Sequence, residues 1–338
     1  MRYIARVTPV RITVALLLFL FTGCGGCNDD DDEYDFRLLK VHGAQGTDPG
    51  LFNTPLGIQI RGVPPAGSPR VFVADYGNRR VQAIEFTLHP SSQPDSAWVF
   101  GESPVDTGDV IWPASVTVTQ ALDDISVPRP DSMYLYVTDL RKDRICKFGM
   151  DGSLVLTWGE SGTDTGQFIS PLGIDTDFAG DIYVADSGNH RIQVFDTLGN
   201  FLRMWGGFGS DPGQFNGPGD VGVGLVYEQT SVKFIAVSDH GNNRIQLFDT
   251  QGNLLSVVGG IPGPVGLNGF KDRVWVLSPS TKTLFNIYAG NPRSASISRG
   301  SRLPDCAEPY DVDGSGHGAS VSDRGTHKVV YYQTTATY

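Results

Sequence analysis

The sequence predicts an all-β fold, a six-bladed β-propeller of four-stranded antiparallel blades in which the N-terminal strand closes the last blade. Three observations predict it. The 338 residues include 42 Gly and 21 Pro, and no long apolar segment of helical period follows residue 23, which favours short strands and tight turns. A unit of four apolar, strand-length segments recurs six times. With 40% hydrophobic residues, the chain can bury a large core.

The third unit is the clearest copy of the repeat. It consists of Pro171–Ile174, Ile182–Phe195 and Phe201–Gly206, with turn residues between the apolar segments. We name the four strands of each unit a to d, from the centre of the ring outwards. The residue that ends strand b serves as an anchor for aligning the units, and it is Asp75, Asp139, Asp186, Asp239, Ser278 or Asp323.

The turn after strand b has a physical explanation. The anchoring aspartate can accept backbone N–H groups, and the Gly-Asn that follows tolerates the positive φ of a tight hairpin. An arginine five residues after the aspartate faces it across that hairpin. The fifth unit has lost both partners, with Ser278 and Thr283 in their places, whereas the sixth keeps a charge pair in Asp323 and Lys328. We therefore expect these ion pairs to be structural rather than catalytic.

These residues resemble the NHL-repeat family. Its pattern is similar to Pro-x-Gly-Ile followed by Val-Ala-Asp-x-Gly-Asn-x-Arg-Ile-Gln, and the resemblance extends over residues 36–333. It implies that the b–c turns and the d–a connections lie on one face of the propeller, with the a–b and c–d loops on the other. Too few residues follow Tyr332 for a fourth strand in the last unit, while Phe36–Gly43 resembles strand d of blade three. Residues 36–338 are therefore expected to form the closed propeller.

The N-terminal segment predicts export and lipidation. Residues 1–23 combine a cationic start with the apolar run Val14–Phe21 and read as a signal peptide. The Thr22-Gly23-Cys24 that follows the apolar run resembles the bacterial lipobox, which implies acylation of Cys24 and a lipid anchor in the membrane. Plain cleavage and release of a free secreted protein is the alternative. Residues 24–35, which include Asp29–Glu33, are expected to form an acidic flexible tether. Gly25 after the cysteine resembles the outer-membrane sorting choice of Gram-negative lipoproteins, which implies the outer membrane of a bacterial cell envelope.

Charge and cysteine content exclude some functions. Removal of the signal takes three of the 26 basic side chains and none of the 37 acidic ones, so the processed chain carries a charge near −14. Such a chain repels phosphate backbones, and no nucleic-acid partner is expected. Cys27, Cys146 and Cys306 give no disulfide framework.

Two faces compete as binding surfaces. The b–c turns present a mixed, somewhat basic set of side chains, and the candidate ligand-binding residues are Tyr76, Arg79, Arg141, His190, His240, Asn243, Arg324 and His327. On the opposite face the a–b connections of blades one, two and four are longer than that of blade three, and the segment Gln120–Asp131 belongs to the longest of them. Long loops on a rigid scaffold often carry recognition.

Enzymatic functions find weaker support. Peptidyl-hydroxyglycine lyases look like NHL propellers and hold zinc with histidines, but no histidine occurs at the starts of the inner strands, which are Gly57, Ser115, Gly173, Asp220, Gly266 and Asp311. Lactonase-like propellers hold Ca²⁺ in the channel, for which Asp220 and Asp311 are weak candidates. Asp311–Gly316 looks like a Ca²⁺ loop, although its place in the repeat predicts a hairpin.

The sequence thus predicts a non-catalytic scaffold that binds a protein, peptide or glycan partner outside the cytoplasm. No catalytic residue and no cofactor is predicted, and Ca²⁺ or Zn²⁺ in the channel stays open. The alternative function is that of a channel-metal lyase or hydrolase.

Overall fold

The computed structural model describes residues 36–61, 70–85, 97–100, 111–119, 133–226, 231–270, 272–303, 305–315 and 318–334. The predicted signal, the tether and the segment Gln120–Asp131 lie outside these residues, so they remain predictions. No helix within the described part is long and apolar enough to cross a membrane.

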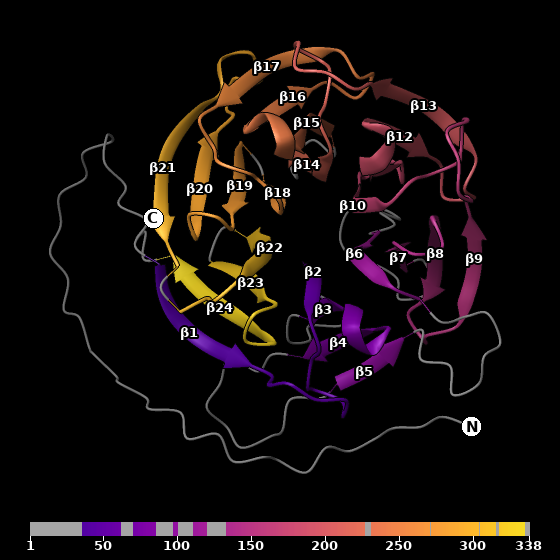
Figure 1. Cartoon of the computed structure of the whole chain (residues 1–338), viewed down its shortest axis with the longest axis vertical. Helices are drawn as coiled ribbons and strands as arrows, with labels where there is room; N and C mark the ends of the chain where they lie inside the picture. Colours follow the sequence, from indigo (N-terminus) through magenta and orange to yellow (C-terminus); the bar gives the residue numbers. More distant parts are fainter. Residues whose placement is uncertain are drawn as a thin grey trace, which may run out of the picture.

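Six four-stranded antiparallel sheets form a ring (Figure 1). Blade one contains β2 (Pro55–Arg61), β3 (Arg70–Asp75), β4 (Arg80–Glu85) and β5 (Ala97–Phe100). Blade two contains β6 (Pro113–Val118), β7 (Tyr134–Asp139), β8 (Arg144–Gly149) and β9 (Leu154–Trp158). Blade three contains β10 (Pro171–Thr176), β11 (Ile182–Asp186), β12 (Arg191–Phe195) and β13 (Phe201–Gly206).

The second half of the ring has the same order of strands. Blade four contains β14 (Pro218–Val226), β15 (Ser231–Asp239), β16 (Arg244–Phe248) and β17 (Leu254–Gly259). Blade five contains β18 (Leu267–Phe270), β19 (Arg273–Ser278), β20 (Thr283–Tyr288) and β21 (Ser296–Arg302). Blade six contains β22 (Pro309–Ser315), β23 (Gly318–Asp323), β24 (Lys328–Thr334) and, as its outer strand, β1 (Phe36–His42).

The ring closes where the sequence predicts. β1 runs antiparallel to β24, and Phe36 pairs with Thr334 while His42 pairs with Val329. The two ends of the propeller chain therefore share one sheet, in which indigo β1 lies beside yellow β24 (Figure 1). Because this pairing covers the outer edge of β24, blade six is as complete as the others.

Each interface between neighbouring blades has its own hydrophobic cluster. Phe72 of blade one packs with Val116 of blade two, and the last interface brings Val329 of blade six against Val71 of blade one. The alternation of strand side chains explains this arrangement, since each blade buries both faces against its neighbours. Cys146 and Cys306 are buried in two different clusters.

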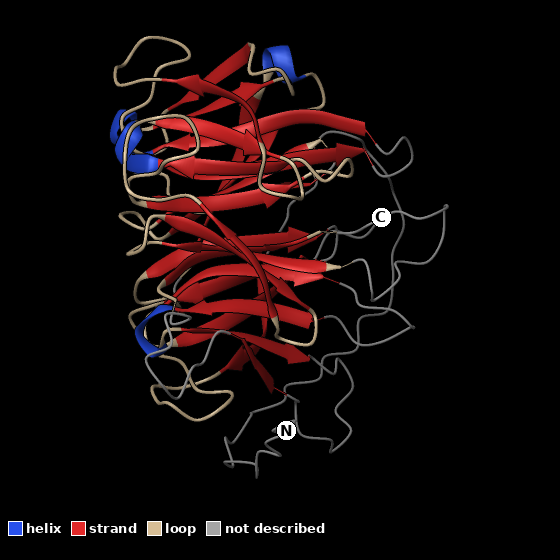
Figure 2. Cartoon of the chain, turned by 90° about the vertical axis from the view of Figure 1, so that its right-hand side faces the viewer, coloured by secondary structure: helices blue, strands red, loops and turns tan. Residues whose placement is uncertain are grey.

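The inner strands begin in the same way in five blades. The leading proline pairs with the anchoring aspartate of strand b, as Pro171 does with Asp186, and an irregularity in the pairing follows at once. In blades one, three and four a short 3₁₀ helix forms the b–c turn: η1 (Tyr76–Asn78), η3 (Ser187–Asn189) and η5 (His240–Asn242). The edge-on view shows short helices along one face of the disc (Figure 2). Another 3₁₀ helix, η6 (Pro292–Ser294), belongs to the c–d loop of blade five.

Candidate functional site

The aspartate at the end of strand b is the centre of a buried polar network. In blade three, Asp186 is completely buried. Its Oδ2 atom accepts hydrogen bonds from Arg191 Nε at 2.8 Å, Asn189 Nδ2 at 2.9 Å and Gln193 Nε2 at 3.0 Å. Its Oδ1 atom accepts the N–H of Ile169 at 2.9 Å. A buried carboxylate is tolerated when it is paired and hydrogen-bonded in this way, so the network is a structural one.

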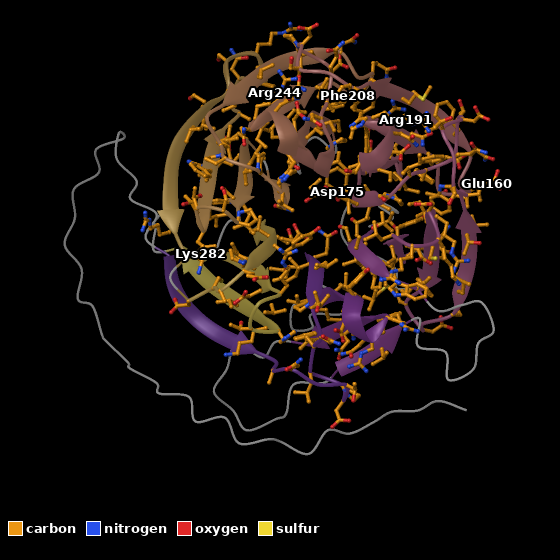
Figure 3. The ribbon with its side chains drawn as sticks, viewed as in Figure 1. Glu160, Asp175, Arg191, Phe208, Arg244 and Lys282 are labelled. Carbon is orange, nitrogen blue, oxygen red and sulfur yellow. The ribbon has the colours of Figure 1, made fainter. Side chains whose placement is uncertain are left out.

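The arginine of this network also holds the connection that enters its own blade. The Arg191 guanidinium donates to the carbonyl oxygens of Thr163, Asp164 and Gln167, at 2.8 to 2.9 Å. The planar fork of the guanidinium suits such multiple contacts. Equivalent ion pairs join Asp75 to Arg80 at 3.0 Å, Asp139 to Arg144 at 3.1 Å and Asp239 to Arg244 at 2.6 Å. The prediction that these pairs are structural is supported by their geometry, and Arg191 and Arg244 lie away from the central channel (Figure 3).

Blades five and six depart from this network in different ways. In blade five, Ser278 Oγ donates to the carbonyl oxygen of Pro262, so this turn is held without a charged pair. In blade six the predicted charge pair is wrong: among the described residues no ion pair joins Lys328 to Asp323. The Asp323 carboxylate instead accepts the N–H groups of Ala307 and Glu308, at 2.9 and 2.7 Å, and the hydroxyl of Thr326. These donors satisfy the carboxylate without a cation.

Three predicted ligand-binding residues serve as joints between blades. His190, Asn243 and His327 each occupy the last position of a b–c turn with φ of 54° to 56°. His190 Nδ1 accepts the N–H of Gly217 at 3.0 Å, and His327 Nδ1 accepts that of Thr54 at 2.9 Å. Asn243 Oδ1 accepts the N–H of Gly263 at 2.8 Å in the same manner. Each side chain thus fastens the connection that enters the next blade.

Two further predicted residues lie on the same face with local partners. The ring of His240 is exposed, and its Nδ1 atom lies 3.2 Å from the carbonyl oxygen of Pro264. The Arg324 guanidinium lies 5.2 Å from the centre of the Tyr310 ring, and its Nε atom lies 3.1 Å from a carboxylate oxygen of Glu308. Arg324 is therefore neutralised by an exposed ion pair.

The remaining predicted residues, Tyr76, Arg79 and Arg141, converge on an aromatic ring. The guanidinium carbons of Arg79 and Arg141 lie 4.9 and 5.3 Å from the centre of the Trp112 ring. Arg141 Nε donates a hydrogen bond to the Tyr76 hydroxyl at 3.3 Å. Both arginines are exposed, and the tyrosine and tryptophan are half-buried. We call Tyr76, Arg79, Trp112 and Arg141 the Trp112 cluster.

Sequence reasoning missed Trp112 itself. Trp112 directly precedes the proline that begins strand a of blade two. The other blades have Thr54, Ser170, Gly217, Gly263 and Glu308 at this position, so an aromatic residue there is a signal that could have found it. The backbone N–H of Trp112 donates to Asp139 Oδ1 at 3.1 Å, and the neighbouring Ile111 is completely buried. The backbone that carries the indole ring is therefore held in place.

Small and polar residues alternate around the inner end of the channel. Gly57, Gly173 and Gly266 belong to blades one, three and five, and Ser115, Asp220 and Asp311 belong to blades two, four and six. The residue before the anchor follows the same two-blade period, because Thr138, Ser238 and Ser322 stand in the even blades. Each of these hydroxyls donates to a carbonyl oxygen of the next blade, as Ser238 does to Val265 at 2.8 Å.

The channel aspartates connect neighbouring inner strands. Asp311 Oδ2 of blade six accepts the N–H of Ile58 in blade one at 2.8 Å, and Asp220 Oδ2 of blade four accepts that of Leu267 in blade five at 2.8 Å. Asp175, which lies beside the central opening (Figure 3), accepts the N–H of Val223 at 2.9 Å. Asp313 takes part as well, as an acceptor from Ile60 N–H. Each of these carboxylates therefore links its own inner strand to the inner strand of the next blade.

Burial changes the acidity of this region. It raises the pKa of the Asp311 carboxyl to about 7, against the lowering effect of the N–H groups of Ile58 and Val312. Burial also raises the pKa of Asp220 well above its usual value, and the nearby Asp311 raises it as well. For the same reason, and because of Asp311, the pKa of Tyr310 at the channel mouth rises to about 12. Burial in the channel thus favours the protonated form of both carboxyl groups.

The channel offers little room for chemistry. The polar cavity between the inner strands, lined by Gln59, Asp175, Asp220, Asn268 and Asp311 among others, has a volume of about 20 Å³. That is enough for a water molecule or a single ion. Within the described residues, no three or more His, Cys, Asp or Glu side chains are arranged to hold a metal ion. The stretch that looked like a Ca²⁺ loop begins inside strand β22, in agreement with the predicted hairpin.

Comparison with known proteins identifies the family. The model of the NHL repeat matches residues 168–195, which run from the buried Phe168 through β10 and β11 into β12. The same Asp–Arg network recurs in blades one and four. The chain is an NHL-repeat propeller. Human NHL repeat-containing protein 3 is 38% identical to it over 130 residues, which are 38% of this chain and 30% of the human protein.

Solved structures share the fold of this NHL-repeat propeller. Virginiamycin B lyase from Staphylococcus aureus is 14% identical, and the match covers 88% of this chain and 99% of the lyase with a TM-score of 0.56. A streptogramin B lyase gives 14% identity, coverage of 89% and 98%, and a TM-score of 0.52. A chain of the nidogen/laminin complex gives 15% identity, coverage of 72% and 79%, and a TM-score of 0.52. At these identities the likeness concerns the fold alone.

Proposed function

We propose that this NHL-repeat propeller is a non-catalytic binding scaffold, which a lipid on Cys24 anchors to the outer membrane of a bacterial cell envelope. Its b–c face binds a protein, peptide or glycan partner. The observation that carries the proposal is the Trp112 cluster, whose exposed cations and aromatic rings lie outside the Asp–Arg network that builds the blades. Exposed arginine and aromatic side chains on a rigid scaffold are the groups most enriched at protein interfaces.

The position of β1 supports an orientation for this scaffold. Phe36 pairs with the end of β24, and His42 pairs with Val329 near the b–c turn, so the chain enters the propeller from the face opposite the b–c turns. Residues 24–35 reach at most ~40 Å when fully extended. With Cys24 in the membrane, the tether would join the propeller on the opposite face, which leaves the b–c face open to a partner.

The fold comparisons are compatible with a binding role. A propeller with this fold occurs in the structure of the nidogen/laminin complex, so the architecture serves in at least one protein assembly. Fold similarity does not transmit function by itself. The proposal therefore depends on the surface chemistry of this chain.

A channel-metal enzyme, a lyase or hydrolase, is the second candidate. Two observations favour it: Asp175, Asp220 and Asp311 line the small polar cavity of the channel, and the buried Asn268 Oδ1 atom, which lines it too, has no hydrogen-bond partner among the described residues. Oxygen atoms of this kind suit Ca²⁺. Metal analysis of the purified propeller tests this candidate. Stoichiometric Ca²⁺ or Zn²⁺, lost together with thermal stability on chelation, would contradict the non-catalytic scaffold.

Lipid anchoring has a direct test. The full-length chain and its Cys24→Ala variant are produced in a Gram-negative host, and membrane and soluble fractions are compared. We expect the variant to move into the soluble fraction, since a single unlipidated tether has no affinity for the bilayer. Equal retention of both proteins in the membrane fraction would refute the anchor.

Partner binding is tested by capture from detergent-solubilised envelope. Three baits are compared: the tethered wild type, a variant with Arg79→Gln and Arg141→Gln, and a variant lacking Gln120–Asp131. Loss of capture in the arginine variant, with capture retained in the deletion variant, supports the b–c face. Loss in the deletion variant alone transfers the function to the opposite face, and no capture by any bait contradicts the scaffold function.

A further inference from the structure

The two arginines of the Trp112 cluster differ from other exposed arginines of the described residues in their partners. Elsewhere on the molecule Arg203 pairs with Asp181 at 2.9 Å and Arg324 pairs with Glu308 at 3.1 Å. Among the residues that the structure describes, no carboxylate lies within ion-pair distance of Arg79 or Arg141. Their charges are nevertheless held together at one ring, on a chain with a formal net charge of −11.

Rigid elements fix this pair of cations in place. Arg79 ends the b–c turn of blade one with a φ of 56°, and its N–H donates to the carbonyl oxygen of Tyr76 at 3.1 Å. Trp112 is tied to Asp139 of blade two. A guanidinium over an aromatic face keeps its N–H groups free around its edge, where they match the two oxygens of a carboxylate. Such pre-organisation lowers the entropic cost of binding an anion.

The charge around the cluster selects the kind of anion. A local cationic pair acts over about one Debye length, ~8 Å at physiological salt. A short segment with a few carboxylates stays within that range. A long polyanion such as RNA or a sulfated glycan extends beyond it and meets the field of a strongly acidic protein.

We propose that the Trp112 cluster is a binding site for a short acidic peptide segment of a partner protein, with Arg79 and Arg141 each receiving a carboxylate. The indole of Trp112 and the phenol of Tyr76 supply the apolar floor and a hydrogen-bonding group between them. This site rests on the proposed binding function of the b–c face, and it assigns that face a ligand chemistry.

The test uses a fluorescein-labelled peptide, Gly-Glu-Glu-Gly-Glu-Glu-Gly, and the same peptide with Gln in place of Glu. Anisotropy is measured with the propeller and with its Arg79→Gln, Arg141→Gln and Lys282→Gln variants. Lys282 is the matched control, because it is an exposed cation at the corresponding position of blade five with a φ of 51°. Circular dichroism and thermal melts confirm that each variant is folded.

We expect the Glu peptide to bind and the Gln peptide not to bind. Arg79→Gln and Arg141→Gln each weaken the affinity about tenfold or more, as the loss of a charge-assisted contact does, while Lys282→Gln changes it less than about twofold. Equal effects of all three variants would reduce the site to general charge attraction and overturn it. Tighter binding of a heparin oligosaccharide or an RNA oligonucleotide, with the same dependence on the two arginines, would assign the site to another ligand.

The outcomes also separate this site from the broader function. If the envelope capture succeeds and both arginine variants capture the partner as well as the wild type, the binding function stands and this site is wrong. If the Glu peptide binds with the expected dependence while no bait captures a partner, the site stands and the scaffold function fails.

Discussion

At the residue scale, glycine and a polar residue alternate around the channel because neighbouring inner strands lie too close for two side chains. A Cβ atom on Gly173 would lie 1.9 Å from Asp220 Oδ1 and 2.5 Å from Asp220 Cα. A Cβ on Gly57 would lie 2.4 Å from Ser115 Cα. Blades one, three and five therefore have glycine at this position, which leaves room for the serine or aspartate side chain of the next blade.

The substitution Gly173→Ala tests this steric account. Because the contact involves Asp220 backbone, blades three and four have to move apart, and we expect a loss of about 2 kcal/mol or more in the free energy of unfolding. Gly259→Ala is the control, since nothing lies within 4 Å of its Cβ position, and it should change stability by less than ~0.5 kcal/mol. Chemical denaturation measures both. Similar values for the two variants would show that the inner strands are not tightly packed.

The buried Asp311 predicts a pH dependence of stability. Its pKa is about 7 in the folded state against a usual 3.8, so the folded protein binds more protons between these values. Its contribution to stability is then fully present below about pH 4 and is lost as the pH rises towards 7. Asparagine cannot titrate. The free energy of unfolding of the wild type minus that of Asp311→Asn should therefore fall between pH 4 and 8, by on the order of 3 kcal/mol.

The difference between the two proteins removes the contribution of carboxyl groups that Asp311 does not influence, so its slope reports Asp311 together with its effect on the nearby Asp220. Denaturation curves at several pH values provide this slope. A flat difference, or one that grows with pH, would mean that Asp311 is already ionised in the folded protein and is stabilised by its backbone donors.

At the element scale, the Asp–Arg network is the unit that shapes each b–c turn and its incoming connection. Asp186 and Arg191 are recognisable from their spacing alone, because both ends of the pair lie in one hairpin. The other partners of Arg191, the carbonyl oxygens of Thr163 and Gln167, lie in a connection whose path the spacing does not reveal. The charge pair expected between Asp323 and Lys328 is wrong for the related reason that backbone N–H groups satisfy Asp323, and these leave no sequence signal.

The repeat spacing predicts only part of the candidate site, because it does not show contacts between different blades or connections. Tyr76, Arg79 and Arg141 are identifiable as residues of exposed b–c turns, since the repeat places those turns. That they meet at Trp112 depends on two blades packing side by side. The role of His190 as a joint is hidden as well, because its partner, the N–H of Gly217, lies 27 residues away in another connection.

A double-mutant cycle in blade three tests whether the pair acts as one unit. Arg191→Thr leaves Asp186 buried without its cation and should cost about 3 kcal/mol or more. The double variant Asp186→Ser with Arg191→Thr copies the residues that blade five uses, Ser278 and Thr283, and should recover part of this loss. We expect a coupling energy of about 1 to 3 kcal/mol from denaturation curves. Additive effects within ~0.5 kcal/mol would mean that the two residues stabilise the turn independently.

At the scale of the whole molecule, the six blades form a ring whose hydrophobic clusters lie between blades rather than within them. Each blade therefore depends on two neighbours, and the pairing of β1 with β24 completes the blade that forms the last interface. The sequence predicts this join because Phe36–Gly43 resembles a strand d and the sixth unit lacks one. The prediction is confirmed because the exposed edge of the last blade needs a fourth strand, and the N-terminal segment is the one that can supply it.

Two truncations test closure. The first removes residues 1–35 and keeps β1, and the second removes residues 1–42 and leaves the outer edge of β24 unpaired. The first should melt like the processed protein. The second should melt at a markedly lower temperature and aggregate, because an open strand edge pairs with other chains. Thermal melts and size-exclusion chromatography compare them, and a synthetic peptide of residues 36–43 should raise the melting temperature of the second by binding to its folded form. Equal melting temperatures, with no effect of the peptide, would show that the ring does not need its N-terminal strand.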